Sequence, residues 1–582
     1  MEESHIQNNQ SSPLQRNDYI WLSLLCWVYF GISLVIPRVF TTHETTHCIN
    51  VREMFDSGSY LIPTYGGRVW LERPPVPHWL TGVGALLVGD IQDEFAMRFP
   101  SILFSWLTVL LVAHLAAQVF GRITGLLSGL VLATMREFAS YAVAPEADIF
   151  LAGIVTIGGM LALKLLSRPA PQSTSFLGNR PTVYWLFYLV MGISHWTKGV
   201  FFGSMFIAWP ILLWLIWTWD RRRFFALFWL PGILLFLGGA ASWLLVASSN
   251  EPGVVDLWKN DYQGRYNTDY MKEPAWYYAV QQPWNIFPWT IALVVGLVTT
   301  FSQIRGTTVS PWRFVWLWAI VPPIFFSLFN GKHHHYMLSC LAPAAILGSQ
   351  GLQRMFSWFQ QQPRWFRHPA LWSGILIPLG LGTILALAKK LPGPANLQTI
   401  LLLAWVPLVL FATWFVSRPQ PRVALVGLLM VITFIHIAAH YFRSKYLDNY
   451  AEDSRLIAEI RELVPPEEHV YVLDEEEPLN ASWNLYYLGR NARQLQNITF
   501  LRSTEIDRPT IYLLARGYHQ EQLAEYGVAE QLLQSKRTRK EITPADRKTL
   551  YRLTFHADLI RVVPPKITPM QSTGRAPGPF LK

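Results

Sequence analysis

Long apolar segments alternate with short polar loops over most of the chain. Roughly 20 apolar residues form a helix long enough to cross a hydrocarbon core of about 30 Å. The pattern predicts a polytopic α-helical membrane protein with about 13 transmembrane helices. The predicted spans are residues 18–37, 98–119, 122–143, 147–166, 182–197, 200–219, 224–247, 284–302, 312–330, 334–351, 370–388, 397–416 and 423–442.

The charges of the loops agree with an odd number of spans. Arginines gather in every second loop, as at Arg122, Arg221 to Arg223, and Arg305. Cytoplasmic loops carry an excess of Lys and Arg, so we predict that these loops are cytoplasmic. The N-terminal tail, residues 1–17, then lies inside, and the two long loops 38–97 and 248–283 face out.

The character of the chain changes after residue 442. An amphipathic helix in EDSRLIAEIREL, a Pro-Pro turn and three apolar runs, HVYVL, TIYLLA and HADLIRVV, predict a small α/β domain. We expect a membrane domain over residues 18–442, an outer α/β domain over 443–566 and a flexible tail over 567–582. Residues 77–89 are short and glycine-rich, and are predicted to form a juxtamembrane helix along the outer leaflet.

Composition supports the membrane interpretation. Hydrophobic residues make up 51% and charged residues only 15% of the chain, which is typical of a membrane protein. The net charge of +10 comes from basic residues scattered in short loops, so it indicates a membrane surface and no nucleic-acid partner. The three cysteines suggest no disulfide framework, and the polar N-terminus lacks the basic region of a cleaved signal.

Ionisable residues near membrane depth are candidates for a functional site, and the first group follows the first span. In HETTHC, a helix would place Glu44, His47 and Cys48 on one face, next to His43. A carboxylate or imidazole there could take a proton from an acceptor hydroxyl. A solvated loop helix would explain the same residues equally well.

The second group is in LERPPVPHWL. Glu72 and Arg73 precede two prolines that fix the backbone, and an arginine there could bind a phosphate with two parallel hydrogen bonds. His78 and Trp79 follow in the predicted interface helix. Ordinary positioning of that helix is the alternative explanation.

The third and fourth groups lie at the outer ends of later spans. Glu146 and Asp148 open a span in PEADIF, where the helix dipole alone would favour carboxylates. Lys198 in HWTKGV and Lys332 in NGKHHHY could extend to the headgroups or hold an anion. The three histidines after Lys332 could form a weak metal site, so a divalent cation is a candidate cofactor and none is certain.

Together these groups suit one reaction. Several cations, a base and lateral access from lipid are what attack on a sugar with a lipid-phosphate leaving group requires. The aromatic segment MKEPAWYYAVQQPWNIFPWT would supply interface anchors or surfaces for sugar stacking. An aromatic belt without a catalytic role explains it as well.

At these residues the chain resembles the superfamily of protein O-mannosyltransferases and bacterial aminoarabinose-to-lipid A transferases. The resemblance covers about residues 18–352 and rests on an ordered set of motifs. They are HETTHCINVREMFDSGSYLIPTYGGRVWLERPPVPHWL, DEFAMRFPSIL, APEADIF, HWTKGV, KEPAWYYAVQQPWNIFPWT and GKHHHYMLSCLAP. The resemblance implies a GT-C fold, an inverting transfer from a polyprenyl-phosphate sugar, and a lumenal or periplasmic active site.

The resemblance also implies roles for matching positions. Glu44 matches the second residue of an acidic pair in the first loop, and Asp148 matches an acidic position that opens the fourth span. His43 stands where the family has an aspartate, usually taken as the base. The expected donor-phosphate ligands are Arg73, Lys198 and Lys332. We expect the substrate pocket to include Glu72, His78, His47, Glu146, Tyr277, His333, His334 and Tyr336.

The histidine at position 43 leaves several interpretations open. Imidazole, with an unperturbed pKa of about 6.5, can act as a base, or Glu44 can take over that role. The change could also mean a different acceptor or lost transfer activity.

We expect a membrane glycosyltransferase that moves a hexosyl or pentosyl group from a polyprenyl-phosphate donor to a lipid, glycan or protein acceptor. The expected location is the plasma (inner) membrane. A transporter or flippase for a lipid-linked sugar, or a non-catalytic binder, is the alternative. Transporters often show internal repeats and charges near the midplane. This chain shows no repeat and carries its notable charges at one face, which favours the enzyme.

Overall fold

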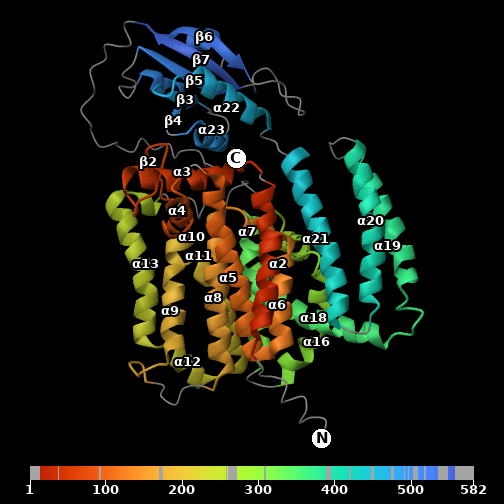
Figure 1. Cartoon of the computed structure of the whole chain (residues 1–582). Helices are drawn as coiled ribbons and strands as arrows, with labels where there is room; N and C mark the ends of the chain where they lie inside the picture. Colours follow the sequence, from red (N-terminus) through yellow and green to blue (C-terminus); the bar gives the residue numbers. More distant parts are fainter. Residues whose placement is uncertain are drawn as a thin grey trace.

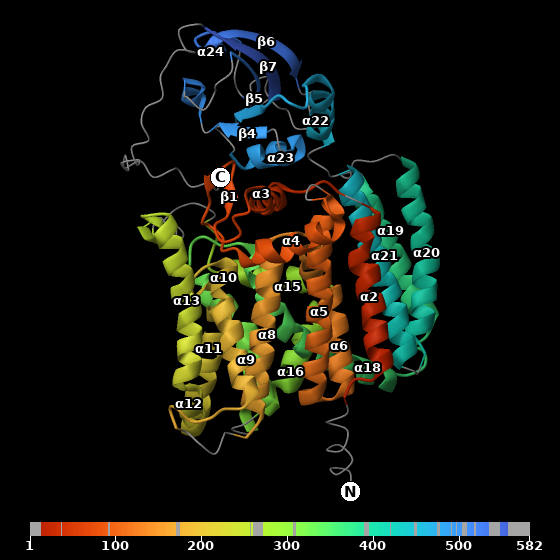
Figure 2. The same cartoon turned by 60° about the vertical axis from the view of Figure 1, so that its left-hand side comes forward.

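The computed structural model is mainly α-helical, with a five-stranded sheet beyond one end of a helical bundle and a short two-stranded hairpin (Figures 1 and 2). The residues that it describes are 13–36, 38–90, 93–169, 175–256, 258–259, 272–306, 310–388, 395–418, 421–446, 451–473, 478–489, 492–495, 497–502, 509–516, 520–534 and 548–556.

Every predicted span overlaps one or more helices of the bundle. These helices are α2 (Arg16–Val35), α5 (Glu94–Phe120), α6 (Arg122–Thr134), α7 (Arg136–Ala142), α8 (Ala147–Ser167), α9 (Thr182–Ile193), α10 (His195–Lys198), α11 (Phe202–Thr218), α12 (Arg221–Leu227), α13 (Leu230–Asn250), α15 (Tyr277–Ile286), α16 (Thr290–Gly306), α17 (Pro311–Ser327), η1 (His334–Cys340), α18 (Leu341–Gln361), α19 (Pro369–Ala388), α20 (Ala395–Val416) and α21 (Pro421–Tyr446).

Five of the described helices are long and apolar enough to cross a membrane: α2, α5, α8, α13 and most of α21. The pair α15 and α16, bent by 107°, would make a sixth span. Several predicted spans are divided in the structure. The span 122–143 breaks at Met135, whose backbone is extended, and the span 284–302 breaks before Pro288, which has no N–H to continue a helix.

The segment between α2 and α5 forms a layer across one end of the bundle (Figure 1). It contains α3 (Thr42–Ser57), the hairpin β1 (Thr64–Tyr65) and β2 (Arg68–Val69), and α4 (Val76–Val88). Thr41 and Glu44 form a capping box, in which each side chain accepts a hydrogen bond from the backbone N–H of the other. This box fixes where α3 begins. Helix α4 exposes Trp79, Val83 and Leu86, as a helix along a membrane surface would.

The C-terminal part folds as an α/β layer beyond α3 (Figures 1 and 2). Its elements are α22 (Ala451–Leu463), β3 (Val470–Leu473), α23 (Pro478–Leu488), β4 (Ala492–Leu495), η2 (Ile498–Arg502), β5 (Thr510–Arg516), α24 (Gln520–Leu523), β6 (Gly527–Gln534) and β7 (Lys548–Phe555). The strand order is β4-β3-β5-β7-β6, with β4, β3 and β5 parallel and β7 and β6 antiparallel to their neighbours.

Two of the three predicted strands coincide with β3 and β5. Alternate residues of β3 face opposite sides of the sheet: Val470 packs with α22 and α23, whereas Tyr471 packs with the other face. The third predicted strand, HADLIRVV, lies outside the described residues apart from His556. The tail, 567–582, also lies outside them.

Helix α23 packs directly on the start of α3. Trp483 Nε1 donates to the Phe40 carbonyl (3.0 Å), and the Phe40 N–H donates to the Tyr487 hydroxyl (2.9 Å). Ser482 Oγ lies 3.0 Å from Thr45 Oγ1, and both Ser482 and Trp483 are fully buried. The α/β layer therefore helps to hold the segment that carries His43.

Candidate active site

An ion pair between Asp148 and Lys198 lies at the centre of the candidate site. Asp148 is in the first turn of α8, and Lys198 ends α10. His335 Nε2, from η1, lies 3.8 Å from Asp148 Oδ1. The Lys198 ammonium also lies 4.8 Å from the ring centre of Tyr336. Three elements that are distant in sequence thus bring together one carboxylate, one ammonium group and an imidazole.

Arg73 and His43 lie near this pair. The Arg73 guanidinium donates to the Glu72 carbonyl (3.0 Å), and among the described residues it has no carboxylate partner. The His43 side chain is open to solvent at one edge, yet the surrounding protein displaces enough water to lower its pKa. Asp148 works against this shift, whereas Arg73 and Lys198 add to it. His43 is therefore predominantly neutral at pH 7.

Glu44 lies in a separate buried network. Its carboxylate is fully buried and accepts two hydrogen bonds from Arg38 (2.6 and 2.8 Å) and one from the Thr41 N–H (2.8 Å). Arg98 Nη1 lies 3.8 Å away. Burial alone would raise the pKa of Glu44, but the charges of Arg38 and Arg98 lower it well below its usual range. The carboxylate is therefore occupied as an acceptor and stays ionised.

Glu146, unlike Glu44, has a buried carboxyl whose protonated form is favoured. It occupies the N-cap position of α8, and in the described part of the chain its carboxyl makes no hydrogen bond or ion pair. Burial raises its pKa well above the usual range, and the charges of Glu44 and Asp148 add to the shift. The protonated carboxyl is therefore favoured at neutral pH.

The histidines His47 and His78 form a buried pair between α3 and α4. Their rings stack at 4.5 Å, and His47 Nε2 lies 2.9 Å from Thr81 Oγ1. Desolvation lowers the pKa of His47 to about 3 and that of His78 well below its usual value. Both rings are neutral and hold the two helices together.

Lys332 and His333 make contacts that join α15, α17 and η1. The Lys332 ammonium is 3% exposed and donates to the carbonyls of Glu273 (2.8 Å) and Phe329. The Tyr278 hydroxyl donates to the His333 carbonyl (3.3 Å), and Tyr277 precedes it on α15. These contacts fix the chain between α17 and η1. His334 contacts Glu137 instead of Asp148.

Three charged residues of these networks were not singled out from the sequence: Arg38, Arg98 and Glu137. Each lies at or near the end of a predicted span, and a charge in that position was a usable signal. Arg98 was visible in DEFAMRFPSIL and Glu137 in TMREFASY. Their partners could not be read from the sequence, because the contacts join separate elements.

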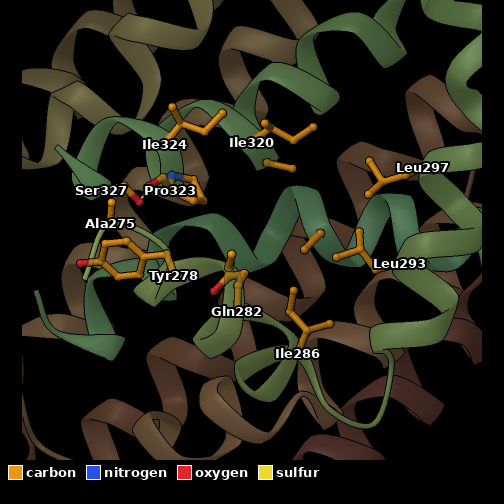
Figure 3. A pocket seen from close by; sticks show the side chains of 13 residues that line it. Ala275, Tyr278, Gln282, Ile286, Leu293, Leu297, Ile320, Pro323, Ile324 and Ser327 are labelled. Atoms are coloured by element: carbon orange, nitrogen blue, oxygen red, sulfur yellow. Dashed lines mark hydrogen bonds between the residues drawn. The ribbon is translucent and has the colours of Figure 1, made fainter. Parts of the chain in front are cut away.

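An apolar groove of about 450 Å³ opens among α15, α16, α17 and α18. Figure 3 shows Ile286, Leu293, Leu297, Ile320 and Ile324 lining it, with the Tyr278 and Gln282 side chains at one side. Tyr278 connects the groove to the segment that leads into η1. One part of the groove lining is therefore hydrogen-bonded to the segment that contains His333.

The described residues contain no cluster of three or more His, Cys, Asp or Glu side chains that could hold a metal ion. The three cysteines, Cys26, Cys48 and Cys340, are buried and unpaired in disulfides. Cys48 packs in the apolar core between α3 and the α/β layer.

Comparisons with known proteins agree with one another. The family described as dolichyl-phosphate-mannose-protein mannosyltransferase matches residues 72–245. An undecaprenyl phosphate-α-4-amino-4-deoxy-L-arabinose arabinosyl transferase of Edwardsiella ictaluri is 29% identical over 353 residues, which cover 57% of this chain and 59% of that protein. Its counterpart from Erwinia tasmaniensis is 29% identical over 337 residues, covering 56% and 57%. The matched stretch thus spans less than two thirds of these relatives.

Solved structures match over more of the chain. ArnT from Cupriavidus metallidurans, crystallised with undecaprenyl phosphate, has a TM-score of 0.72 at 17% identity and covers 92% of this chain and 97% of its own. An Archaeoglobus fulgidus oligosaccharyltransferase with a tethered acceptor peptide has a TM-score of 0.50 at 11% identity, covering 85% and 66%. At these identities the matches establish an ArnT-like GT-C fold.

Proposed function

We propose, from the similarity of this chain to protein O-mannosyltransferases and bacterial aminoarabinose transferases, that it is a membrane glycosyltransferase. It takes a hexosyl or pentosyl group from a polyprenyl-phosphate donor and transfers it, with inversion, to a hydroxyl or phosphate of a lipid, glycan or protein acceptor. The names of its relatives favour an amino-pentosyl group carried on undecaprenyl phosphate as the donor.

The observation that carries this proposal is the Asp148–Lys198 pair with Arg73 beside it. When the acceptor oxygen attacks the anomeric carbon, the bond from that carbon to the donor phosphate oxygen breaks, and negative charge collects on the leaving phosphate. Lys198 and Arg73 stabilise that charge. Asp148 holds Lys198 in place, whereas Arg73 has no competing carboxylate among the described residues.

His43 is the base that receives the proton of an acceptor hydroxyl. Three nearby groups can be compared by their protonation at pH 7. Glu44 is ionised but fully engaged by Arg38, and Glu146 favours its protonated form. His43 is neutral and reachable from solvent, so it has a free nitrogen for a proton. Glu44 holds Arg38 and Arg98, and Glu146 offers a hydrogen-bond donor to the substrate.

The apolar groove accommodates the isoprenoid chain of the donor. Its lining is almost entirely aliphatic, and its Tyr278 end adjoins the segment before η1 (Figure 3). A donor that stays in the bilayer explains why the enzyme is itself a bundle of apolar helices. We propose about 13 spans, a location in the plasma (inner) membrane, and an outer face that holds α3, the candidate site and the domain over 443–566.

The proposal is tested with purified protein and a panel of polyprenyl-phosphate sugars. We expect transfer or slow hydrolysis of one donor, lost in His43→Ala with donor affinity retained. Glu44→Gln should chiefly lower the melting temperature, because it leaves two buried arginines without their carboxylate, a change that typically costs about 3–5 kcal/mol. Donor binding without turnover in the wild type or any variant would refute the enzyme and favour a non-catalytic binder. The histidine at position 43, where the family has an aspartate, is consistent with that alternative.

A further inference from the structure

A second polar cluster lies beside the candidate site, around Glu137 of α7. Its carboxylate is 1% exposed, yet it contacts two side chains that are open to solvent. Arg136 Nη1 lies 2.8 Å from Glu137 Oε2, and His334 Nδ1 lies 2.5 Å from Glu137 Oε1. The His334 side chain is 43% exposed. One buried carboxylate thus fixes two exposed basic groups next to each other.

The contacts of the cluster determine which atoms remain available. Because Nδ1 of His334 faces the carboxylate, it carries the proton of the neutral ring, and Nε2 is left at the exposed edge without a partner among the described residues. Asn285 donates to the His334 carbonyl (3.3 Å) and fixes its backbone. The Arg136 guanidinium lies 5.0 Å from the ring centre of Trp284 and uses one nitrogen for Glu137.

The cluster lies between the candidate site and the aromatic surface of α15. The Tyr141 ring contacts both His334 (6.3 Å) and His335 (6.0 Å between ring centres), and His335 is the imidazole next to Asp148. On the other side, Trp284 is 53% exposed. Exposed tryptophans typically mark the headgroup region of a membrane, so the cluster is at the depth of lipid phosphates.

We propose that Arg136 and His334 bind a phosphate group of a lipid acceptor while its reacting oxygen reaches the Asp148–Lys198 site. The inference rests on the proposed transferase function, which requires that an acceptor approach from the outer leaflet. A phosphate accepts hydrogen bonds on several oxygens, which the guanidinium fork of Arg136 supplies, and a phosphate hydroxyl can donate to His334 Nε2. Glu137 keeps both side chains in place and balances the charge of Arg136.

Binding to this cluster must be measured apart from binding to the donor-phosphate site. Because Arg73 and Lys198 would also attract lipid phosphates, binding is measured in an Arg73→Gln background. The probes are lysophosphatidic acid, the monoacylglycerol with the same chain, and inorganic phosphate. Variants are Arg136→Gln, His334→Asn and Glu137→Gln, with Arg305→Gln as the matched control. Arg305 also lies over an aromatic ring, 4.2 Å from the centre of Phe301, but at the other end of the bundle.

We expect lysophosphatidic acid to bind more tightly than monoacylglycerol, and each of the three variants to weaken it roughly tenfold or more, as loss of a charged hydrogen bond does. Arg305→Gln should bind as its parent does. Equal binding of the neutral lipid, or undiminished binding in Arg136→Gln and His334→Asn, would overturn the inference. Inorganic phosphate that binds as tightly as the lipid would overturn the assignment to a lipid.

This assay needs no turnover, so its outcome is separate from that of the transferase. Absence of transfer from every donor would refute the proposed function and leave the phosphate measurement intact. If transfer is found, Arg136→Gln should raise the acceptor KM and leave the donor KM unchanged. Melting temperatures of all variants exclude unfolding as the cause of weaker binding.

Discussion

At the scale of single residues, similar side chains have different roles because they have different partners. Lys198 and Lys332 both end in a buried ammonium group, but Lys198 faces Asp148 and Lys332 faces two backbone carbonyls. Arg38 is paired with Glu44, whereas Arg73 has no carboxylate partner in the described part of the chain. An unpaired arginine beside the candidate site is the group most available to an incoming phosphate.

Arg73→Ala should therefore weaken use of the donor strongly. Removing a charged partner from a desolvated phosphate typically costs about 2–5 kcal/mol, which would appear as a large fall in kcat/KM for the donor. The measurement is steady-state kinetics with the best donor, and Arg73→Lys is the control because it retains the charge without the fork. Unchanged turnover and donor affinity in Arg73→Ala would rule out the phosphate role.

The pH profile should report His43. Its pKa lies below the usual 6.5, so the ring is neutral at pH 7 and takes a proton only at more acid pH. We expect kcat to stay level through neutral pH and to fall below pH 6.5 as the base is lost. In His43→Asn the residual rate should lack this inflection. An inflection that persists in His43→Asn would assign it to another group.

At the scale of elements, helix α3 is held from both sides. Below it, Glu44 joins Arg38 and Arg98, and His47 contacts α4. On the other side, side chains of α23 form hydrogen bonds with the Phe40 backbone and with the Thr45 hydroxyl. The position of His43 is therefore set partly by a domain that is about 440 residues away in the sequence.

Tyr487→Phe should test this coupling. The Phe40 N–H and Glu94 each lose a hydrogen-bond partner, which typically costs about 1–3 kcal/mol when such groups are buried. If α23 positions α3, kcat should fall with donor KM unchanged, and the acid inflection of His43 should move. Tyr551→Phe, on the opposite face of the sheet, is the control. A loss of stability with an unaltered pH profile would limit Tyr487 to a structural role.

At the scale of the whole molecule, the site is built where three layers meet. The helical bundle supplies Asp148 and Lys198, the segment between α2 and α5 supplies His43 and Arg73, and the α/β layer covers α3 of that segment (Figure 2). Helix α3 and the sheet lie at one end of the helical bundle, and α12, which begins with Arg221 to Arg223, lies at the other end (Figure 1).

Cysteine labelling can test this orientation, because the three native cysteines are buried. We expect Ser57→Cys, at the exposed end of α3, to react with a membrane-impermeant maleimide in intact cells. Arg305→Cys, at the exposed end of α16, should react only after the membrane is opened. The reverse pattern would invert the proposed topology.

The sequence by itself determined the kind of protein and the location of its helices. Apolar runs, loop charges and ordered motifs are local properties, so they indicated the regions of the bundle helices, two strands of the sheet and the resemblance to a transferase superfamily. They also indicated Asp148, Lys198 and Arg73 as residues of one site. The sequence did not predict where helices end or break, because these points depend on the backbone conformation of single residues such as Met135.

Only the tertiary structure decided which charges face which. The motif suggested Glu44 as a base, but Arg38 and Arg98 bury and occupy its carboxylate. His334 was expected in the substrate pocket, but its contact with Glu137, 197 residues away, could not be read from the sequence. Such pairs form where helices pack, and their pKa shifts follow from burial and neighbouring charge. Neither quantity is a property of a linear pattern.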